Sequence, residues 1–275
     1  MYSPLIDILF GDFIISKKYI YGIFIFIELT LFRKGTTMNL KVILFDLDGT
    51  LLPMDQDVFL KDYFSRMVKK LAPHGYEPDT LVKSIYAGTN AMIANDGSAT
   101  NETVFWNSFT KFFGEQARNE EALFDNYYRN EFQEVKHSCG FLPEAATTIK
   151  ILRDMGYRVV LATNPLFPSI ATESRIRWAG MSPEDFELFT TYENSSFCKP
   201  NLNYYKEILE KLGVKPEECL MVGNDVGDDM VAEQLGMKVF LIPRDLINKE
   251  GKDISNYPQG TLHDLLTYLE ILCEK

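Results

Sequence analysis

The chain has 275 residues, of which 46% are hydrophobic and 24% charged. This length is enough to bury a sizeable core and suits one domain with a smaller inserted one. With 28 basic and 39 acidic residues, the formal net charge is −11, which argues against binding to nucleic acid or to an anionic membrane surface. The cysteines Cys139, Cys198, Cys219 and Cys273 lack metal-ligand spacing and predict free thiols in a reducing cytoplasm.

Residues 1–37 differ in composition from the rest of the chain. The apolar stretch 20–32 contains Glu28 and is shorter than the roughly 20 residues of a membrane-spanning helix. Lys17 and Lys18 fit the basic region of a secretory signal, but no small-residue cleavage site follows. We favour a third interpretation, in which Met38 is the true start and residues 1–37 are non-native upstream sequence. An apolar leader and a membrane anchor are the alternatives.

Residues 57–135 are predicted to be helical, because their apolar residues recur at helical spacing and β-branched runs are absent. The pattern predicts helices that begin near Asp57 and that cover 78–87, 102–113 and 120–132. Thr100 is the expected N-cap of the third of these helices. The polar loop 95–101 before it has turn chemistry, and we expect it to help select the substrate. The aromatic residues of this segment predict the core of a small helical bundle.

From Pro143 onward, helices and strands alternate. Strands are predicted at 157–162, 188–191, 219–222 and 238–242, and helices at 143–154, 169–179, 203–211, 229–235 and after Thr261. Such alternation indicates a parallel sheet with helices on both faces. The predicted fold class is therefore α/β, a Rossmann-like three-layer α/β/α sheet. Its core comprises residues 38–56 and 136–275, and residues 57–135 form an inserted helical cap.

The apolar strand 41–45 leads directly into Asp46 and Asp48. Strand alternation predicts that both carboxylates point to the same side of the sheet, at the carboxyl end where open α/β sheets bind ligands. Two acids so placed favour an oxygen-ligand metal site, or a nucleophile with an acid/base partner. An acidic turn without function is the alternative, because Asp-Gly is a common turn dipeptide.

Three later segments place polar residues after predicted strands or before a predicted helix. Thr163 and Asn164 follow the strand 157–162 and offer a hydroxyl and backbone amides to phosphate oxygens. Lys199, followed by Pro200, precedes the helix 203–211 and offers a fixed positive charge. The segment 223–229, Gly-Asn-Asp-Val-Gly-Asp-Asp, follows the strand 219–222. Its concentrated negative charge favours a bound divalent cation.

In this order the four segments resemble motifs one to four of the haloacid dehalogenase superfamily, most of whose members are magnesium-dependent phosphohydrolases. The position of the helical segment resembles the subclass with a cap between motifs one and two. Motif four departs from the usual pattern, because Asn224 directly follows the glycine. We assign the direct metal role to Asp225 and a supporting role to Asp229, with Asn224 and Asp229 as the alternative register. Asp228 is interpreted as a helix N-terminal acid without a catalytic role.

The resemblance implies a Mg²⁺-dependent phosphatase of a small phosphorylated metabolite. Asp46 would attack phosphorus to form an aspartyl-phosphate, and Asp48 would act as general acid and base. Thr163, Asn164 and Lys199 would hold the phosphoryl oxygens, and Asp46, Asp225 and the Asp48 carbonyl would bind Mg²⁺. A phosphomutase and a non-catalytic module on the same fold are the alternatives. The sequence leaves monomer and homodimer open and predicts no nucleic-acid or membrane partner.

Overall fold

The computed structural model describes residues 40–273 of the chain. Within that part, residues 40–271 belong to one compact unit. Residues 1–37, for which we predicted upstream sequence or a leader, lie outside the described residues. No helix of the described part is long and apolar enough to cross a membrane.

A five-stranded parallel sheet forms the centre of the fold, with the strand order β3-β2-β1-β4-β5. The strands are β1 (Val42–Phe45), β2 (Arg158–Leu161), β3 (Leu188–Phe189), β4 (Cys219–Gly223) and β5 (Lys238–Leu241). β1 is central, with Phe45 paired to Leu161 on one side and to Val222 on the other. The carboxyl ends of these three strands therefore meet at one edge, where ligands bind in open α/β sheets.

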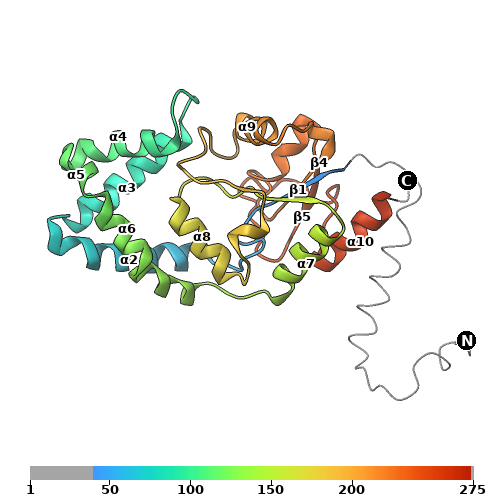
Figure 1. Cartoon of the computed structure of the whole chain (residues 1–275), viewed down its shortest axis with the longest axis horizontal. Helices are drawn as coiled ribbons and strands as arrows, with labels where there is room; N and C mark the ends of the chain where they lie inside the picture. The colour runs from blue at the N-terminus through green and yellow to red at the C-terminus, as the bar shows by residue number, and fades with distance from the viewer. Residues whose placement is uncertain (1–39, 274–275) are drawn as a thin grey trace, which may run out of the picture. The chain divides into compact units, whose positions relative to one another are not determined.

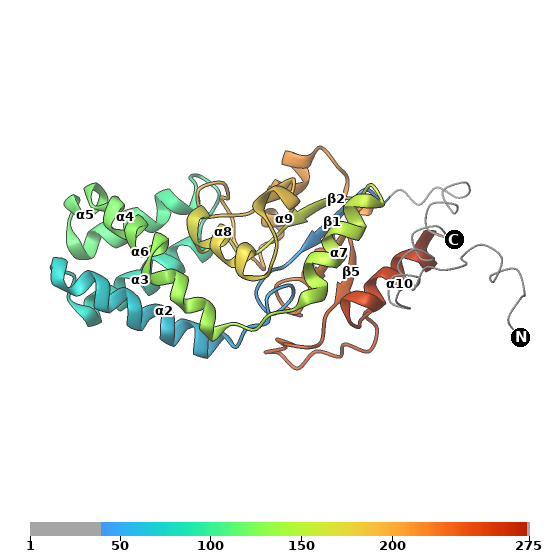
Figure 2. The same cartoon turned by 60° about the horizontal axis from the view of Figure 1, so that its bottom comes forward.

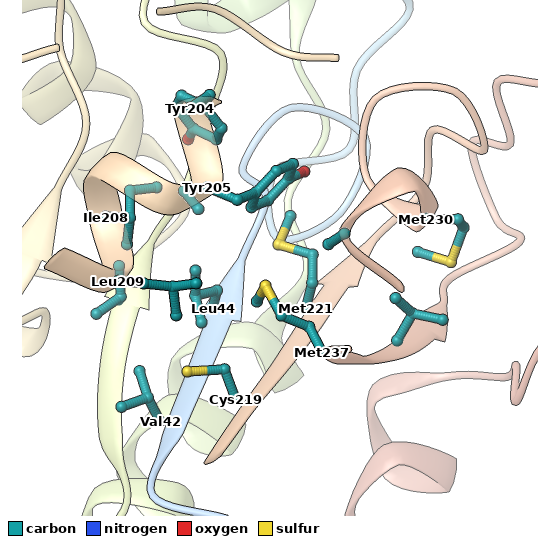
Figure 3. Packing of buried hydrophobic residues seen from close by; sticks show 14 of the residues in the cluster. Val42, Leu44, Tyr204, Tyr205, Ile208, Leu209, Cys219, Met221, Met230 and Met237 are labelled. Atoms are coloured by element: carbon teal, nitrogen blue, oxygen red, sulfur yellow. The ribbon is translucent and has the colours of Figure 1, made fainter. Parts of the chain in front are cut away.

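Helices cover both faces of the sheet, as Figure 1 shows: α9 (Leu202–Leu212) lies on one side, and α7 (Pro143–Asp154) and α10 (Leu262–Cys273) lie on the other. Val42 and Leu44 of β1 and Met221 of β4 are fully buried under α9. Figure 3 shows Tyr205 of α9 extending toward Met221. Burial of both faces explains why the strand sequences are continuously apolar. The predicted three-layer α/β/α fold is confirmed.

The helical insert, residues Gln56–Ser138, connects β1 to α7 and β2. It contains α2 (Gln56–Leu71), η1 (Ala72–His74), α3 (Pro78–Ile93), α4 (Asn101–Phe113), α5 (Gln116–Asn119), α6 (Glu121–Arg129) and η2 (Glu131–Ser138). Asp55 caps α2 by accepting from two backbone amides, and Thr100 caps α4 as predicted. The insert has its own aromatic core, in which Phe59, Tyr63, Trp106 and Phe109 are buried.

Helix α8 (Ser169–Trp178) lies between the insert and the sheet in both views (Figures 1 and 2). Its residue Ala171 is buried in the aromatic core of the insert, and Trp178 packs against the same core. The short helices η3 (Pro183–Asp185), η4 (Pro216–Glu218) and η5 (Met230–Leu235) complete the chain. Helix α8 therefore contacts the insert directly.

Three predicted helices differ from those observed. The helix expected at 120–132 ends at Arg129, because the Asn130 side chain donates to the Asn126 carbonyl and its backbone leaves the helical region. The helix expected at 229–235 is the 3₁₀ helix η5. Helix α3 continues to Ile93 instead of ending near residue 87, since its turn residues begin only at Asn95.

Candidate active site

Asp46 directly follows β1 and is the central carboxylate of the sheet edge. Its backbone amide donates to the Val222 carbonyl at 2.9 Å, which fixes it beside the end of β4. The residue is buried, with 8% relative exposure. Its two oxygens have different partners: Oδ1 accepts from Lys199 Nζ at 3.0 Å, and Oδ2 accepts from the Thr50 hydroxyl at 3.2 Å. A buried carboxylate with both oxygens oriented is suited to act as a nucleophile.

Lys199 connects Asp46 to a second buried acid, because Nζ also donates to Asp229 Oδ1 at 2.6 Å. The side chains of Lys199 and Asp229 are each 1% exposed. Burial by itself lowers the pKa of Lys199, but the carboxylates of Asp229 and Asp46 raise it well above its ordinary value. The two carboxylates therefore favour the charged form of Lys199 at the sheet edge.

Thr50 lies between Asp46 and Asn224. Its Oγ1 is 3.2 Å from Asp46 Oδ2 and 3.0 Å from Asn224 Oδ1. One hydroxyl proton can satisfy only one of these oxygens at a time. Gly49 allows the close approach, because its φ of +88° and the 2.3 Å distance from a Cβ at this position to Asn224 Nδ2 both exclude a side chain.

Asp229 reaches the sheet edge because Gly223 has no side chain. A Cβ on Gly223 would lie 2.0 Å from Asp229 Oδ2. That oxygen accepts from the Asp225 backbone amide at 2.9 Å. The Asp225 carboxylate is used differently, since its Oδ1 accepts from the amides of Gly227 and Asp228 at 2.8 and 3.0 Å. The structure thus brings Asn224 and Asp229 to Asp46 and Lys199, whereas Asp225 holds the turn together.

Asp48 has a partner that the sequence did not suggest, the guanidinium of Arg175 on α8, which donates to Asp48 Oδ2. Arg175 is 1% exposed, and its Cζ lies 4.5 Å from the centre of the Phe167 ring. The other carboxylate oxygen, Asp48 Oδ1, is buried and has no hydrogen-bond partner in residues 40–273. Burial raises the pKa of Asp48 above its ordinary value, Arg175 opposes this, and Asp46 adds to it.

Thr163 and Asn164 follow β2 at the same edge. Thr163 is buried, and its carbonyl accepts from the hydroxyls of Thr190 and Tyr204 at 2.6 and 2.9 Å. Asn164 Nδ2 lies 3.3 Å from Asp228 Oδ2, and Asn164 Oδ1 is buried without a partner in the described chain. Burial raises the pKa of Asp228, the Lys199 charge opposes this, and the carboxylates of Asp225 and Asp46 add to the rise. Asp228 therefore contacts Asn164 at the sheet edge, a contact that our interpretation of it as a helix N-terminal acid did not include.

The loop 95–101, which we expected to help select the substrate, also attaches the insert to the core. Asn101 is fully buried, and its backbone amide donates to the Ser195 carbonyl at 2.8 Å. Its side-chain Nδ2 lies 3.4 Å from the carbonyls of Pro165 and Phe197. These contacts use the polar groups of Asn101 to hold the loops that carry Asn164 and Lys199.

Comparison with known proteins identifies the family. Residues 40–236 match the haloacid dehalogenase-like hydrolase family. The chain belongs to this family. The match covers β1 to η5, and so includes every residue described above at the sheet edge.

Sequence identity to individual proteins is low. The chain is 27% identical over 202 residues to a phosphoglycolate phosphatase of Aquifex aeolicus. This alignment covers 74% of this chain and 84% of that protein. It is 27% identical over 229 residues to a glyceraldehyde 3-phosphate phosphatase of Methanothermobacter thermautotrophicus, and this alignment covers 78% of this chain and 94% of that protein. A solved HAD phosphatase from Thermococcus onnurineus superposes with a TM-score of 0.52 at 24% identity. The superposition covers 84% of this chain and 98% of that chain, and it supports the fold. The predicted superfamily and the prediction of a hydrolase are confirmed.

Members of this family were expected to bind Mg²⁺, and the oxygen donors at the sheet edge fit that ion. In residues 40–273, no three acidic, histidine or cysteine side chains gather closely enough to hold a metal by themselves. The oxygens that meet at Thr50 are one carboxylate and one amide, and the Asp48 carbonyl is adjacent in sequence. Mg²⁺ prefers such hard oxygens and takes few carboxylates, because it keeps water and substrate oxygens as ligands.

Arg175 is the functional candidate that sequence reasoning missed. It lies in a predicted helix without a clear apolar stripe, and arginine is rarely buried, so no pattern marked it. Thr50, which lies two residues after Asp48, also received no role from the sequence. The burial of Asn224 and Asp229 was not predictable from an acidic run that also fits an exposed turn.

Proposed function

We propose that this hydrolase is a Mg²⁺-dependent phosphatase that acts on a small phosphate monoester through an aspartyl-phosphate on Asp46. The observation that carries the proposal is a pair of acids with separate partners, in which Asp46 is buried and the Asp48 side chain is 20% exposed. Asp46 is oriented by Lys199 and Thr50, while Asp48 is held by Arg175 with its Oδ1 unpartnered. A nucleophile beside an acid of raised pKa is what transfer of a phosphoryl group to a carboxylate requires.

Each step of the reaction has a candidate group in this chain. Asp46 attacks phosphorus, and Asp48 gives its proton to the leaving oxygen through Oδ1 and later takes a proton from water. Lys199 and the Thr163 and Asn164 groups hold the phosphoryl oxygens. Asp46, the Asp48 carbonyl and Asn224 or Asp225 would hold Mg²⁺, which would neutralise negative charge on the phosphoryl group. Asp229 holds Lys199 in place.

The substrate class rests on the relatives, which are named for phosphoglycolate, glyceraldehyde 3-phosphate and pyrophosphate. All of these are small phosphorylated compounds, but their leaving groups differ. A haloacid dehalogenase activity is disfavoured, because a dehalogenase does not need Asp48 as an acid for the leaving group. The experiment that tests the proposal is phosphate release from a panel of phosphate monoesters and p-nitrophenyl phosphate. We expect release only with Mg²⁺, loss with a chelator, and recovery when Mg²⁺ is restored.

A matched pair of variants in this assay distinguishes the two metal-ligand registers. We expect Asn224→Ala to raise the Mg²⁺ concentration for half-maximal activity by about tenfold or more, because Asn224 Oδ1 shares the Thr50 hydroxyl with Asp46. Asp225→Ala should change it by less than about threefold, since its carboxylate accepts two amides of its own turn. The reverse order would restore Asp225 as the direct ligand. Mg²⁺-independent release would contradict the metal assignment as a whole.

A further inference from the structure

A cavity of about 200 Å³ lies between the helical insert and loops of the core. Its walls come from α2, α3, α4 and α6, and its floor is the segment Leu166–Phe167–Pro168, with Tyr192 beside it. This floor begins two residues after Asn164. Phe167 contributes to the cavity and also stacks against Arg175, the partner of Asp48. The cavity is therefore adjacent to the candidate active site but outside the residues assigned to catalysis.

The walls of the cavity are predominantly aromatic. Nine of its lining side chains are aromatic, among them Trp106, Phe124 and Tyr128. Trp106 is 2% exposed, and its Nε1 lacks a hydrogen-bond partner of standard geometry in residues 40–273. The hydroxyls of Tyr63 and Tyr128 already bond to each other at 2.9 Å. Few polar groups are left to bind a sugar or another polyhydroxy group.

The charged lining residues are both acidic, Glu121 and Asp125. No lysine, arginine or histidine of the described chain lines the cavity, which makes it unfavourable for a phosphate or a carboxylate. Asp125 pairs with Arg129 at 3.9 Å, whereas the nearby Arg118 pairs with Glu102 and lies over the Trp106 ring instead of pairing with Glu121. Burial raises the pKa of Glu121, as does the Glu102 carboxylate, while Arg118 opposes them.

Aromatic walls with a carboxylate and no lysine, arginine or histidine among the lining residues are an environment in which proteins bind organic ammonium groups. We propose that this cavity binds an alkylammonium ion of the quaternary type, with Glu121 as its counter-charge and the aromatic rings as its walls. Such an ion can be free in solution, or it can be the leaving group of a phosphate monoester. The second case rests on the proposed phosphatase function, and the first does not.

The test compares a cation with a neutral molecule of the same shape. Calorimetry on the full chain measures binding of choline and of 3,3-dimethylbutan-1-ol, in which carbon replaces the charged nitrogen. We expect saturable binding of choline that is about tenfold or more tighter than that of the alcohol. Glu121→Gln should remove most of this difference, and Tyr86→Leu, at the half-exposed edge of the cavity, should weaken choline binding. Glu115→Gln, an exposed acid outside the cavity, is the matched control.

Equal binding of both molecules, no binding of choline, or an equal effect of Glu115→Gln would overturn the proposal. A second arm measures turnover of phosphocholine and 3,3-dimethylbutyl phosphate, with p-nitrophenyl phosphate as the general substrate. If the ammonium group belongs to the leaving alcohol of a substrate, phosphocholine is turned over faster than its neutral analogue, and choline competes with phosphocholine. If choline binds but does not compete, the cavity takes the free ion. Turnover of p-nitrophenyl phosphate without choline binding refutes the cavity proposal alone, and choline binding without turnover of any ester refutes the phosphatase alone.

Discussion

Asp46→Asn is expected to reduce phosphate release by at least about 10³-fold, because the amide cannot attack phosphorus in place of the carboxylate. The substitution keeps the shape of the side chain, and Lys199 Nζ can still donate to its remaining oxygen. We therefore expect the variant to fold with a melting temperature within a few degrees of the parent protein. Steady-state kinetics with a sensitive phosphate assay measures the loss.

The control for this variant is Asp154→Asn, which removes an exposed acid of α7 that pairs with Lys150 far from the sheet edge. Its activity should equal that of the parent chain. Residual activity of Asp46→Asn above about one tenth of the parent rate, in protein shown to be free of deamidation, would mean that Asp46 is not the nucleophile.

Arg175→Met is expected to give the second large effect. It removes the guanidinium that holds Asp48 Oδ2 while keeping an apolar side chain beside Phe167. If Arg175 positions Asp48 as the general acid, turnover should fall by about 10²-fold for an alkyl phosphate, whose leaving oxygen needs a proton. The loss should be about tenfold smaller for p-nitrophenyl phosphate, whose leaving group departs as a stable anion.

This dependence on the leaving group separates positioning from a structural role, since a partly unfolded enzyme would lose activity equally on both substrates. Arg175→Lys should recover only part of the lost rate, because an ammonium does not reproduce the planar fork of arginine. Arg177→Met is the matched control on the same helix, where Arg177 forms an exposed pair with Glu173. Equal losses on the two substrates would assign Arg175 to stability alone.

The fold could be predicted from the sequence because the patterns that specify its strands and helices are local. The run Val42–Phe45 is continuously apolar, and the later alternation of helices with short apolar strands specifies a covered parallel sheet. The ends of the helices were harder to predict. Asn130 ends α6 through a side-chain bond to the helix backbone, and no periodicity in the apolar residues reports such a bond.

The candidate site was predictable only where a residue follows a strand or a motif. Asp46, Asp48, Thr163 and Lys199 were named on that basis, and the structure places them at one sheet edge. The residues that orient these side chains and shift their pKa values come from elsewhere in the chain. Arg175 meets Asp48 across 127 positions of sequence. Which of two neighbouring side chains, Asn224 or Asp225, faces Asp46 depends on the backbone of a turn, which a one-residue difference in spacing does not reveal.

The most direct test of the account is to trap the intermediate on Asp46. The Asp48→Asn variant is mixed with p-nitrophenyl phosphate and Mg²⁺, quenched in acid, digested and analysed by mass spectrometry. Because this leaving group needs no acid, the first step should proceed, whereas water is no longer activated for the second. We predict one phosphoryl group on the peptide that contains Asp46. Turnover by the parent enzyme with no phosphoryl group on that peptide, or with it on another residue, would contradict the account.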